Sequence, residues 1–227
     1  MKYYKLVESI NINEIGIYPQ VTNTEKFFDT QEFGLGFNER IEKEFILPVP
    51  IMENKAKVTS IISVTAIDNS VFLVLKNYFI DFLKKFKIGD FQFWNIDVYH
   101  KKQLIKDYYL FHLSYPSQKE VIDFEKSKFK IKDNTNIILE QKKYTDYHGY
   151  QTDWKKLIWE GSVITFDTLY LDFSSANLDL IRIIDIDSIG IGYYVSERLK
   201  NAIEKEKFTG FAFQEIEEMD KRIKVIF

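Results

Sequence analysis

Three histidines are the residues of this sequence that could most directly bind a metal ion. His100, His112 and His148 stand far apart and lack the i, i+4 spacing of a helical zinc site. His148 lies near Asp146 and Asp153, but one imidazole with two carboxylates is a weak set of cation ligands. We therefore predict that the protein binds no metal ion and carries no cofactor.

Acidic residues occur in pairs that could in principle exchange protons. General acid–base catalysis needs two carboxylates in one pocket with pKa values pushed apart, which spacing along a strand cannot provide. We interpret these pairs as solvated strand faces: Asp123 with Glu125, Asp167 with Asp172, and Asp185 with Asp187. The "GIG" at Gly190–Gly192 lacks the third glycine of a dinucleotide fingerprint. No catalytic residue is predicted, so the chain is not expected to be an enzyme.

One segment, "KYTDYHGYQTDWKKLIW" from Lys143 to Trp159, is rich in residues that suit protein recognition. Tyrosine and tryptophan supply rigid contacts at interfaces, and aspartate supplies charge complementarity. Its polar pattern predicts a loop over Gln141–Asp153. We predict that the contacts to a partner come from Tyr144, Asp146, Tyr147, His148, Tyr150, Asp153 and Trp154. The alternative is that the aromatic residues pack this loop onto the protein's own core.

A second candidate patch is the acidic run "QEIEEMD" near the end of the chain. It contains Glu215, Glu217 and Glu218, which could steer the approach of a basic partner. A short run of charge is more often simply a solvated edge.

The composition limits the class of protein. The chain has 227 residues, 45% apolar and 16% aromatic, which is enough to bury a sizeable core. The net charge of −3 gives no basic footprint for nucleic acid. There is no cysteine, no apolar run approaches the roughly 20 residues of a membrane span, and the first residues lack a signal-peptide core. We expect a cytoplasmic protein that binds neither nucleic acid nor membrane.

The pattern of apolar residues predicts an α+β fold with a mixed, mostly antiparallel sheet and a few packed helices. A helix is expected from Val71 to Phe86, because Phe72, Leu75, Phe79, Phe82 and Phe86 recur at three- and four-residue steps after a capping Ser70. "FGLGF" at 33–37 is expected to be a loop. Strands are predicted at Lys2–Glu8, Phe91–Val98, Tyr108–Tyr115, within Val121–Ile131, and in "KLIWEGSVITF", "TLYLDF" and "LIRIIDI".

A strand, helix, strand unit occurs twice in the sequence. Ser196 is an expected N-cap, with a helix to Lys207, a stop at Gly210 and a strand containing Phe211 and Phe213. A shift of 120 residues places this unit on a helix from Tyr78 to Phe86 and a strand with Phe91 and Phe93. We predict an internal repeat of this unit.

The chain is expected to form one domain, residues 1–227, of two halves. The polar segment Lys132–Asn136 suggests a seam that divides residues 1–135 from residues 136–227.

Three segments carry a resemblance to a known family: "YYLFHL", "VIDFEKSKF" and "YYVSERLKNAIEKEKFTGFAFQEIE". With these motifs the chain resembles the bacterial immunity proteins of polymorphic toxin systems, in a family long catalogued as a domain of unknown function. The match runs from Lys57 to Glu218, is strongest at Val195–Phe213, and leaves the first fifty residues uncovered. The resemblance implies a protein that binds a cognate protein toxin and blocks it, without catalytic residues.

Two other functions stay open from the sequence. The chain could be an enzyme with a dispersed carboxylate or tyrosine site, or a regulatory binding module that has no toxin partner. A toxin gene directly upstream would favour the immunity hypothesis.

Overall fold

The computed structural model describes residues 1–26, 40–42, 44–67, 71–114, 118–184, 186 and 190–227, and it shows an α+β fold. In this part of the chain strand residues outnumber helical residues, and the three sheets are mixed and mostly antiparallel, as predicted. The helices are α1 (Ile12–Ile15), α2 (Asn77–Leu83), α3 (Gln118–Val121), α4 (Tyr147–Trp159), α5 (Glu197–Lys205) and α6 (Ile216–Met219).

The first sheet has the strand order β2-β3-β6-β7-β5-β4. Its strands are β2 (Val21–Thr24), β3 (Pro50–Met52), β4 (Ile61–Ile62), β5 (Phe72–Lys76), β6 (Phe91–His100) and β7 (Gln103–Leu113). Strands β6 and β7 are antiparallel neighbours in a hairpin that turns at Lys101 and Lys102.

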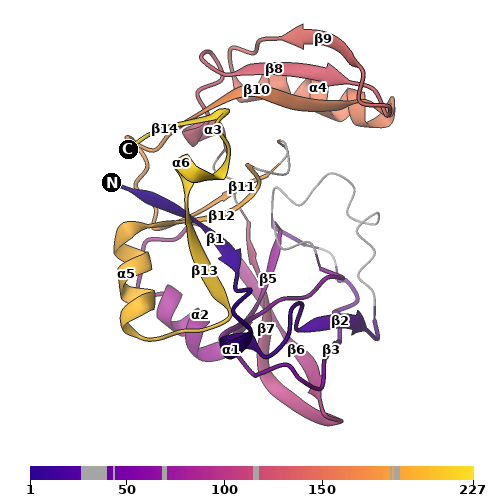
Figure 1. Ribbon diagram of the computed structural model, residues 1–227, viewed down its shortest axis with the longest axis vertical. Helices are drawn as coiled ribbons and strands as arrows, with labels where there is room; N and C mark the ends of the chain where they lie inside the picture. Colours follow the sequence, from indigo (N-terminus) through magenta and orange to yellow (C-terminus); the bar gives the residue numbers. More distant parts are fainter. Residues whose placement is uncertain (27–39, 43, 68–70, 115–117, 185, 187–189) are drawn as a thin grey trace.

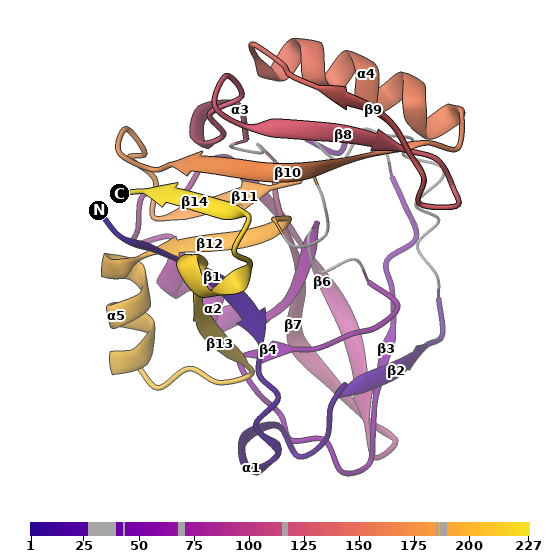
Figure 2. The same ribbon diagram turned by 45° about the horizontal axis from the view of Figure 1, so that its top comes forward.

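The second sheet has the order β11-β12-β1-β13, with β1 (Tyr3–Glu8), β11 (Leu180–Ile183), β12 (Gly192–Ser196) and β13 (Phe211–Glu215). The third has the order β14-β10-β8-β9, with β8 (Lys128–Lys132), β9 (Ile138–Lys142), β10 (Val163–Asp172) and β14 (Ile223–Ile226). Strands β8 and β9, the first half of β10 and helix α4 form a layer at one end of the molecule, which we call the head (Figures 1 and 2).

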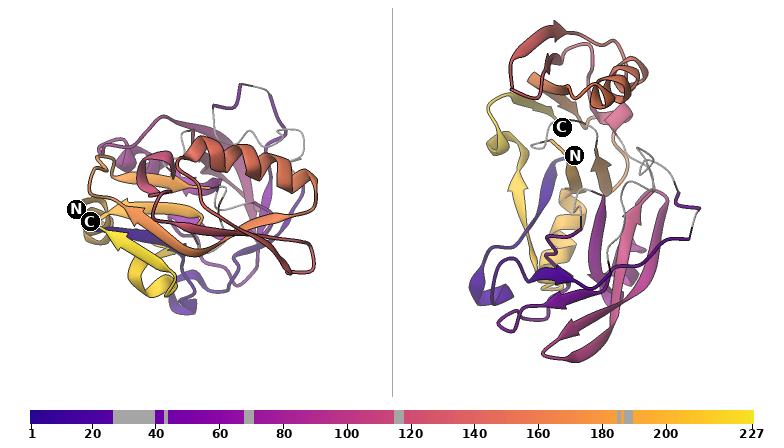
Figure 3. Two further views of the ribbon diagram at one scale, coloured as in Figure 1. Left: turned by 90° about the horizontal axis from the view of Figure 1, so that it is seen from above. Right: turned by 90° about the vertical axis from the view of Figure 1, so that its right-hand side faces the viewer.

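Strand β1 connects the two ends of the chain. It lies between β12 and β13 and is antiparallel to both, so the N-terminal strand completes a sheet of C-terminal strands. The two termini consequently lie side by side in every view (Figure 3). Successive residues of β1 point into different cores: Tyr3 packs with residues of the head, and Tyr4 packs with α2 and α5.

The predicted repeat of a strand, helix, strand unit is present in the fold. Strand β5 starts at 72, α2 at 77 and β6 at 91, while β12 starts at 192, α5 at 197 and β13 at 211. Each pair of elements differs by the same 120 residues that align the sequences. Leu199 and Ile203 of α5 and Phe79 and Leu83 of α2 are buried in one shared core.

A third strand extends the repeat beyond what the sequence alignment predicted. In the first unit, β7 lies between β5 and β6 and pairs Leu73 with Phe111; in the second unit, β1 lies between β12 and β13 and pairs Tyr193 with Leu6. The strand on the other side of β7 and of β1 gives the same equivalence. Phe91 of β6 pairs with Leu113 of β7, and Phe211 of β13 pairs with Glu8 of β1. Strand β1 is therefore the counterpart of β7.

Equivalent side chains in these two strands make equivalent hydrogen bonds. Tyr108 corresponds to Tyr3, and their hydroxyl groups donate to the carbonyl oxygens of Thr59 at 2.6 Å and Leu178 at 2.5 Å. Both carbonyls lie just before the strand that borders the unit, β4 or β11. The molecule thus contains two copies of a four-stranded unit, and the second copy takes its central strand from the N-terminus.

The predicted helix from Val71 to Phe86 is wrong in its first part. Residues 72–76 form strand β5, the helix covers only 77–83, and Ser70 lies outside the described residues. The three- and four-residue spacing predicted a helix here because β5 is buried on both faces. Phe72 and Val74 enter one core, and Leu73 and Leu75 enter another. A strand with apolar residues at every position satisfies any periodicity. The "FGLGF" loop also lies outside the described residues.

The predicted loop over Gln141–Asp153 is also wrong, since α4 begins at Tyr147 after the N-cap Asp146. The predicted strand beginning at Lys156 starts only at Val163, because 156–159 belong to the same helix. Tyr150, Trp154 and Leu157 follow the i, i+4, i+7 spacing and pack on the core of the head. Tertiary packing therefore stabilises a helix whose tyrosines, glycine and threonine have modest helix propensity.

The strand predicted within Val121–Ile131 is present as β8, which begins at Lys128, and the segment also contains the end of α3. The predicted seam at residue 136 falls in the turn between β8 and β9, which pair with each other. Both predicted halves therefore contribute strands to the same sheets. Ser196 caps α5 as predicted, since its Oγ accepts a hydrogen bond from the backbone N–H of Leu199 at 3.2 Å.

Candidate functional site

The predicted aromatic cluster lies on and just before α4, and its members divide between core and surface. Tyr144 and Tyr150 are 6% and 1% exposed, and their rings pack edge to face with centroids 5.3 Å apart. Tyr147 and Trp154 are half-buried against the same core. Tyr144 and Tyr150 follow the alternative interpretation, in which these aromatics pack on the protein's own core, and they are not accessible to a partner in the folded protein.

The polar residues of this cluster have structural partners or are fully exposed. Asp146 caps α4 by accepting a hydrogen bond from the backbone N–H of Gly149 at 2.8 Å. Asp153 forms an ion pair with Lys142 of β9, and His148 is exposed in the first turn of α4. Among the residues that the structure describes, no group of three His, Cys, Asp or Glu side chains could hold a metal ion.

The acidic patch lies where β13 meets α6. The Glu215 carboxylate forms an ion pair with Lys2 Nζ at 2.6 Å. Glu217 and Glu218 are exposed in the first turn of α6. Helix α6 lies beside β14, whereas α4 lies on the outer side of the head (Figure 2). The two predicted patches are therefore separate surfaces.

The carboxylate pairs have basic or hydroxyl partners of their own. Asp123 forms an ion pair with Lys126 at 2.6 Å, and this hydrogen bond holds the pKa of Asp123 below its usual range. Asp167 pairs with Lys130, and Asp172 accepts a hydrogen bond from the backbone N–H of Ser174 at 2.9 Å. Asp185 and Asp187 lie outside the described residues.

Several buried tyrosines are hydrogen-bond donors in the framework. Besides Tyr3 and Tyr108, Tyr194 donates its hydroxyl to the carbonyl of Gly190 at 2.6 Å. Burial raises the pKa of Tyr3 to about 12, so its hydroxyl stays protonated at neutral pH. These hydroxyl groups are accordingly suited to structural hydrogen bonds rather than to proton abstraction.

Asp179 is the most buried carboxylate of the described residues and joins the two repeated units. Its side chain is 2% exposed and accepts hydrogen bonds from Ser196 Oγ at 2.7 Å, from the backbone N–H of Lys87 at 2.9 Å, and from Arg198. Burial by itself would raise the pKa of Asp179, but the hydrogen bonds from Arg198, Ser196 and Lys87 outweigh it and lower the pKa.

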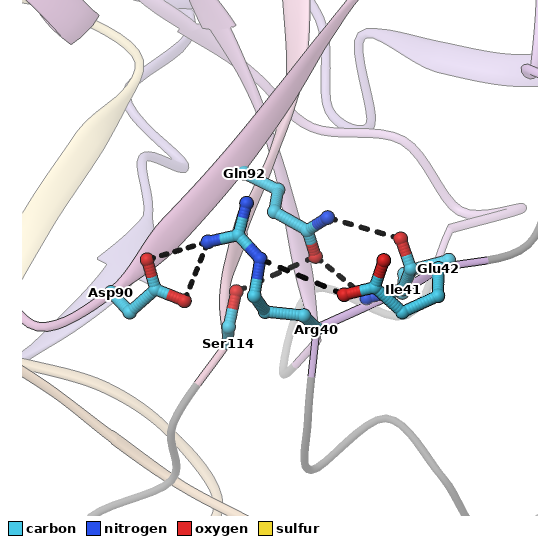
Figure 4. Close-up of polar contacts among 6 residues, drawn as sticks. All are labelled: Arg40, Ile41, Glu42, Asp90, Gln92 and Ser114. Atoms are coloured by element: carbon cyan, nitrogen blue, oxygen red, sulfur yellow. Dashed lines mark hydrogen bonds and ion pairs between the residues drawn. The ribbon is translucent and has the colours of Figure 1, made fainter.

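A second polar cluster ties residues 40–42 to strand β6 (Figure 4). The Gln92 side chain accepts from the backbone N–H of Ile41 at 2.7 Å and donates to its carbonyl at 3.0 Å, as a neighbouring strand would. The Arg40 guanidinium contacts both oxygens of Asp90 at 2.7 Å. Because Arg40 and Asp90 are each about half exposed, solvent screens this pair and it contributes little to stability.

An open groove of about 310 Å³ lies at the end of β1, lined by residues that include Lys5, Val7, Glu8, Tyr18 and Gly192. Burial lowers the pKa of the Lys5 amine to about 8. A lysine of this kind is partly neutral near pH 8 and could act as a nucleophile toward a carbonyl group.

The free end of the head carries a surface that the sequence analysis missed. Six large apolar side chains, which we call the tip patch, are exposed there: Ile137 (61%), Ile138 (50%), Leu139 (58%), Ile158 (42%), Trp159 (84%) and Val163 (48%). They come from the start of β9, the end of α4 and the start of β10, which meet at the same end of the head (Figures 1 and 2). The sequence signal that could have indicated this surface is the run of three apolar residues in "NIILEQ", which follows a polar turn.

A row of lysines borders the tip patch. Lys128, Lys130 and Lys132 alternate along β8, so their side chains share one face of the sheet, opposite the face of the buried Phe129, on which Tyr150 of α4 packs. Lys132 pairs with Ile138 on one side and Val163 on the other, which places these three side chains together. Lys130 forms an ion pair with Asp167 of β10.

No family model matches the chain, and no curated protein matches it. None of the helices in the described ranges has the length and apolar composition needed to cross a bilayer.

Proposed function

We propose that this protein is a cytoplasmic bacterial immunity protein that binds a cognate toxin of a polymorphic toxin system and occludes it. The observation that carries the proposal is the tip patch, because several large apolar side chains exposed at one end of a protein mark a surface for a partner. Two of the motifs that resemble the immunity family supply framework: "VSERLK" and "TGFAF" form the end of β12, the start of α5 and the start of β13. Binding would therefore fall outside these two motifs, on the head.

The test is protection of growth. The gene is co-expressed with the toxin gene beside it, and we expect the wild-type protein to restore growth and to bind the purified toxin directly. An unrelated α+β protein expressed at the same level serves as the control. Growth arrest in the presence of well-folded wild-type protein, or the lack of a neighbouring toxin gene, contradicts the immunity proposal.

The second candidate function is enzymatic and depends on the groove at Lys5, whose amine has a lowered pKa. The same growth assay separates the two functions. Lys5→Arg keeps the charge but removes the nucleophilic amine, so occlusion predicts full protection by this variant. If the variant melts like the wild type yet loses protection, the chemistry of Lys5 is favoured.

A further inference from the structure

We propose that β9 is the docking strand of this protein and that it pairs with an extended, acidic segment of the partner, which also covers the tip patch. The inference rests on the proposed function and names the surface that the toxin would occupy.

The backbone of β9 is open for pairing. Strand β9 is the last strand of its sheet and, in the part of the chain that the structure describes, pairs only with β8. An edge strand presents a row of outward N–H and C=O groups, which proteins usually protect with prolines or charged side chains. In β9 the charged residues Glu140 and Lys142 come only after the exposed Ile138 and Leu139, which follow the exposed Ile137. Addition of a partner strand to such an edge is an established mode of peptide recognition.

The side chains around β9 would provide the rest of the contact. Trp159, at 84% exposed, is the most exposed large apolar side chain among the described residues and belongs to a residue type enriched at binding hot spots. Ile158 and Val163 also line a groove of about 240 Å³ between α4 and β10. Thr165 lines this groove as well, and its buried Oγ1 has no hydrogen-bond partner among the described residues. A partner polar group entering the groove could satisfy it.

The charge of the head indicates an acidic partner. Residues 128–167, which span the head, contain seven lysines and six acidic residues, a net charge of +1, whereas the rest of the chain carries 24 basic and 28 acidic residues, a net charge of −4. A strand added to β9 would lie two strands, or about 10 Å, from the lysine row, which is about one Debye length at 0.1 M salt. The same lysines would repel a second copy of this head, which disfavours a symmetric dimer through β9.

The experiment measures binding of the purified toxin, encoded beside this gene and inactivated at its catalytic site, to five forms of the full-length protein. The apolar variant is Leu139→Ser with Trp159→Ser, and its control is Ile10→Ser with Ile46→Ser, two residues of similar exposure elsewhere. The charge variant is Lys128→Glu with Lys132→Glu, and its control is Lys101→Glu with Lys102→Glu at the β6–β7 turn. The fifth form is the wild type, and melting curves verify that all five are folded.

We expect the apolar variant to weaken the Kd by about 30-fold or more, as loss of a hot spot does. The charge variant should slow association by about tenfold at low salt, with a smaller effect at high salt. Neither control should change binding by more than about threefold. Hydrogen exchange of the backbone amides of Ile138–Lys142 should slow when the toxin binds, which a merely adjacent contact would not produce.

The outcomes separate this inference from the proposed function. If the wild type binds the toxin, but both head variants bind equally well and β9 exchange is unchanged, then the docking site is wrong and the immunity function stands. If the folded wild type does not bind the toxin, both are overturned. Sedimentation that shows a dimer of the wild type, abolished by the apolar variant, would assign β9 to a second copy and overturn the inference.

Discussion

Asp179 is the residue on which the connection between the repeated units depends most. It is buried, and its carboxylate accepts hydrogen bonds from residues of β12, α5 and the turn after α2. We expect Asp179→Asn to lower the free energy of unfolding by about 2–3 kcal/mol at pH 7, because the amide cannot accept all of these hydrogen bonds. Urea denaturation measures the change, and Asp97→Asn, at an exposed position of β6, is the matched control.

The pH dependence gives an independent check on Asp179. Its pKa is lowered in the folded protein, so its stabilisation is fully present above the unfolded pKa of about 3.9 and is lost as the pH falls through the lower folded value. The stability difference between wild type and Asp179→Asn should therefore be constant above about pH 5 and shrink below about pH 4. A difference that persists unchanged at pH 3 would show that the carboxylate charge is not the cause.

Strands β1 and β7 provide the test of the repeat, since they occupy the same place in the two units. Tyr3→Phe and Tyr108→Phe each remove one hydroxyl that donates to a backbone carbonyl from a fully buried position. Each carbonyl loses the same partner, so we expect the two variants to be destabilised similarly, by about 1–2 kcal/mol. Chemical denaturation of both variants measures this.

Tyr4→Phe removes a hydroxyl from the neighbouring residue of β1 and serves as the control for these variants. It should be close to neutral, since the Tyr4 ring packs in the core formed by α2 and α5 without an equivalent buried hydrogen bond to a carbonyl among the described residues. A large loss for only one of Tyr3→Phe and Tyr108→Phe would contradict the structural equivalence of β1 and β7.

The whole molecule should unfold as one cooperative unit, although the head extends from one end. The core of the head contains Tyr144 and Tyr150 together with Tyr3, Ile181 and Tyr194 of the second sheet. Trp94 lies in the first sheet, while Trp154 and Trp159 lie on α4. In the double variant Trp154→Phe with Trp159→Phe, the tryptophan fluorescence comes from Trp94 alone. We expect its urea transition to coincide with the transition that circular dichroism records for the same variant.

The complementary variant, Trp94→Phe, reports the head through Trp154 and Trp159. Its fluorescence should again coincide with its circular dichroism. A head transition at lower urea than the dichroism transition would show that the head unfolds separately.

The sequence by itself determined the structures that depend on neighbouring residues. Helix α5 was predicted with its Ser196 cap and the strand that follows, because capping and amphipathic spacing act within a few residues. The repeat of 120 residues was visible because both copies of that local unit are continuous in the chain. The absence of cysteine also follows directly from composition.

Only the tertiary structure decided the features made by distant segments. It placed β1 between β12 and β13, and it made a strand of Phe72–Lys76 by burying both faces. It also turned Tyr144 and Tyr150 into the core and left Trp159 exposed, although all three lie in one aromatic segment. The physical reason is that burial depends on which elements pack against a residue, and sequence spacing does not contain that information for segments joined only by the fold.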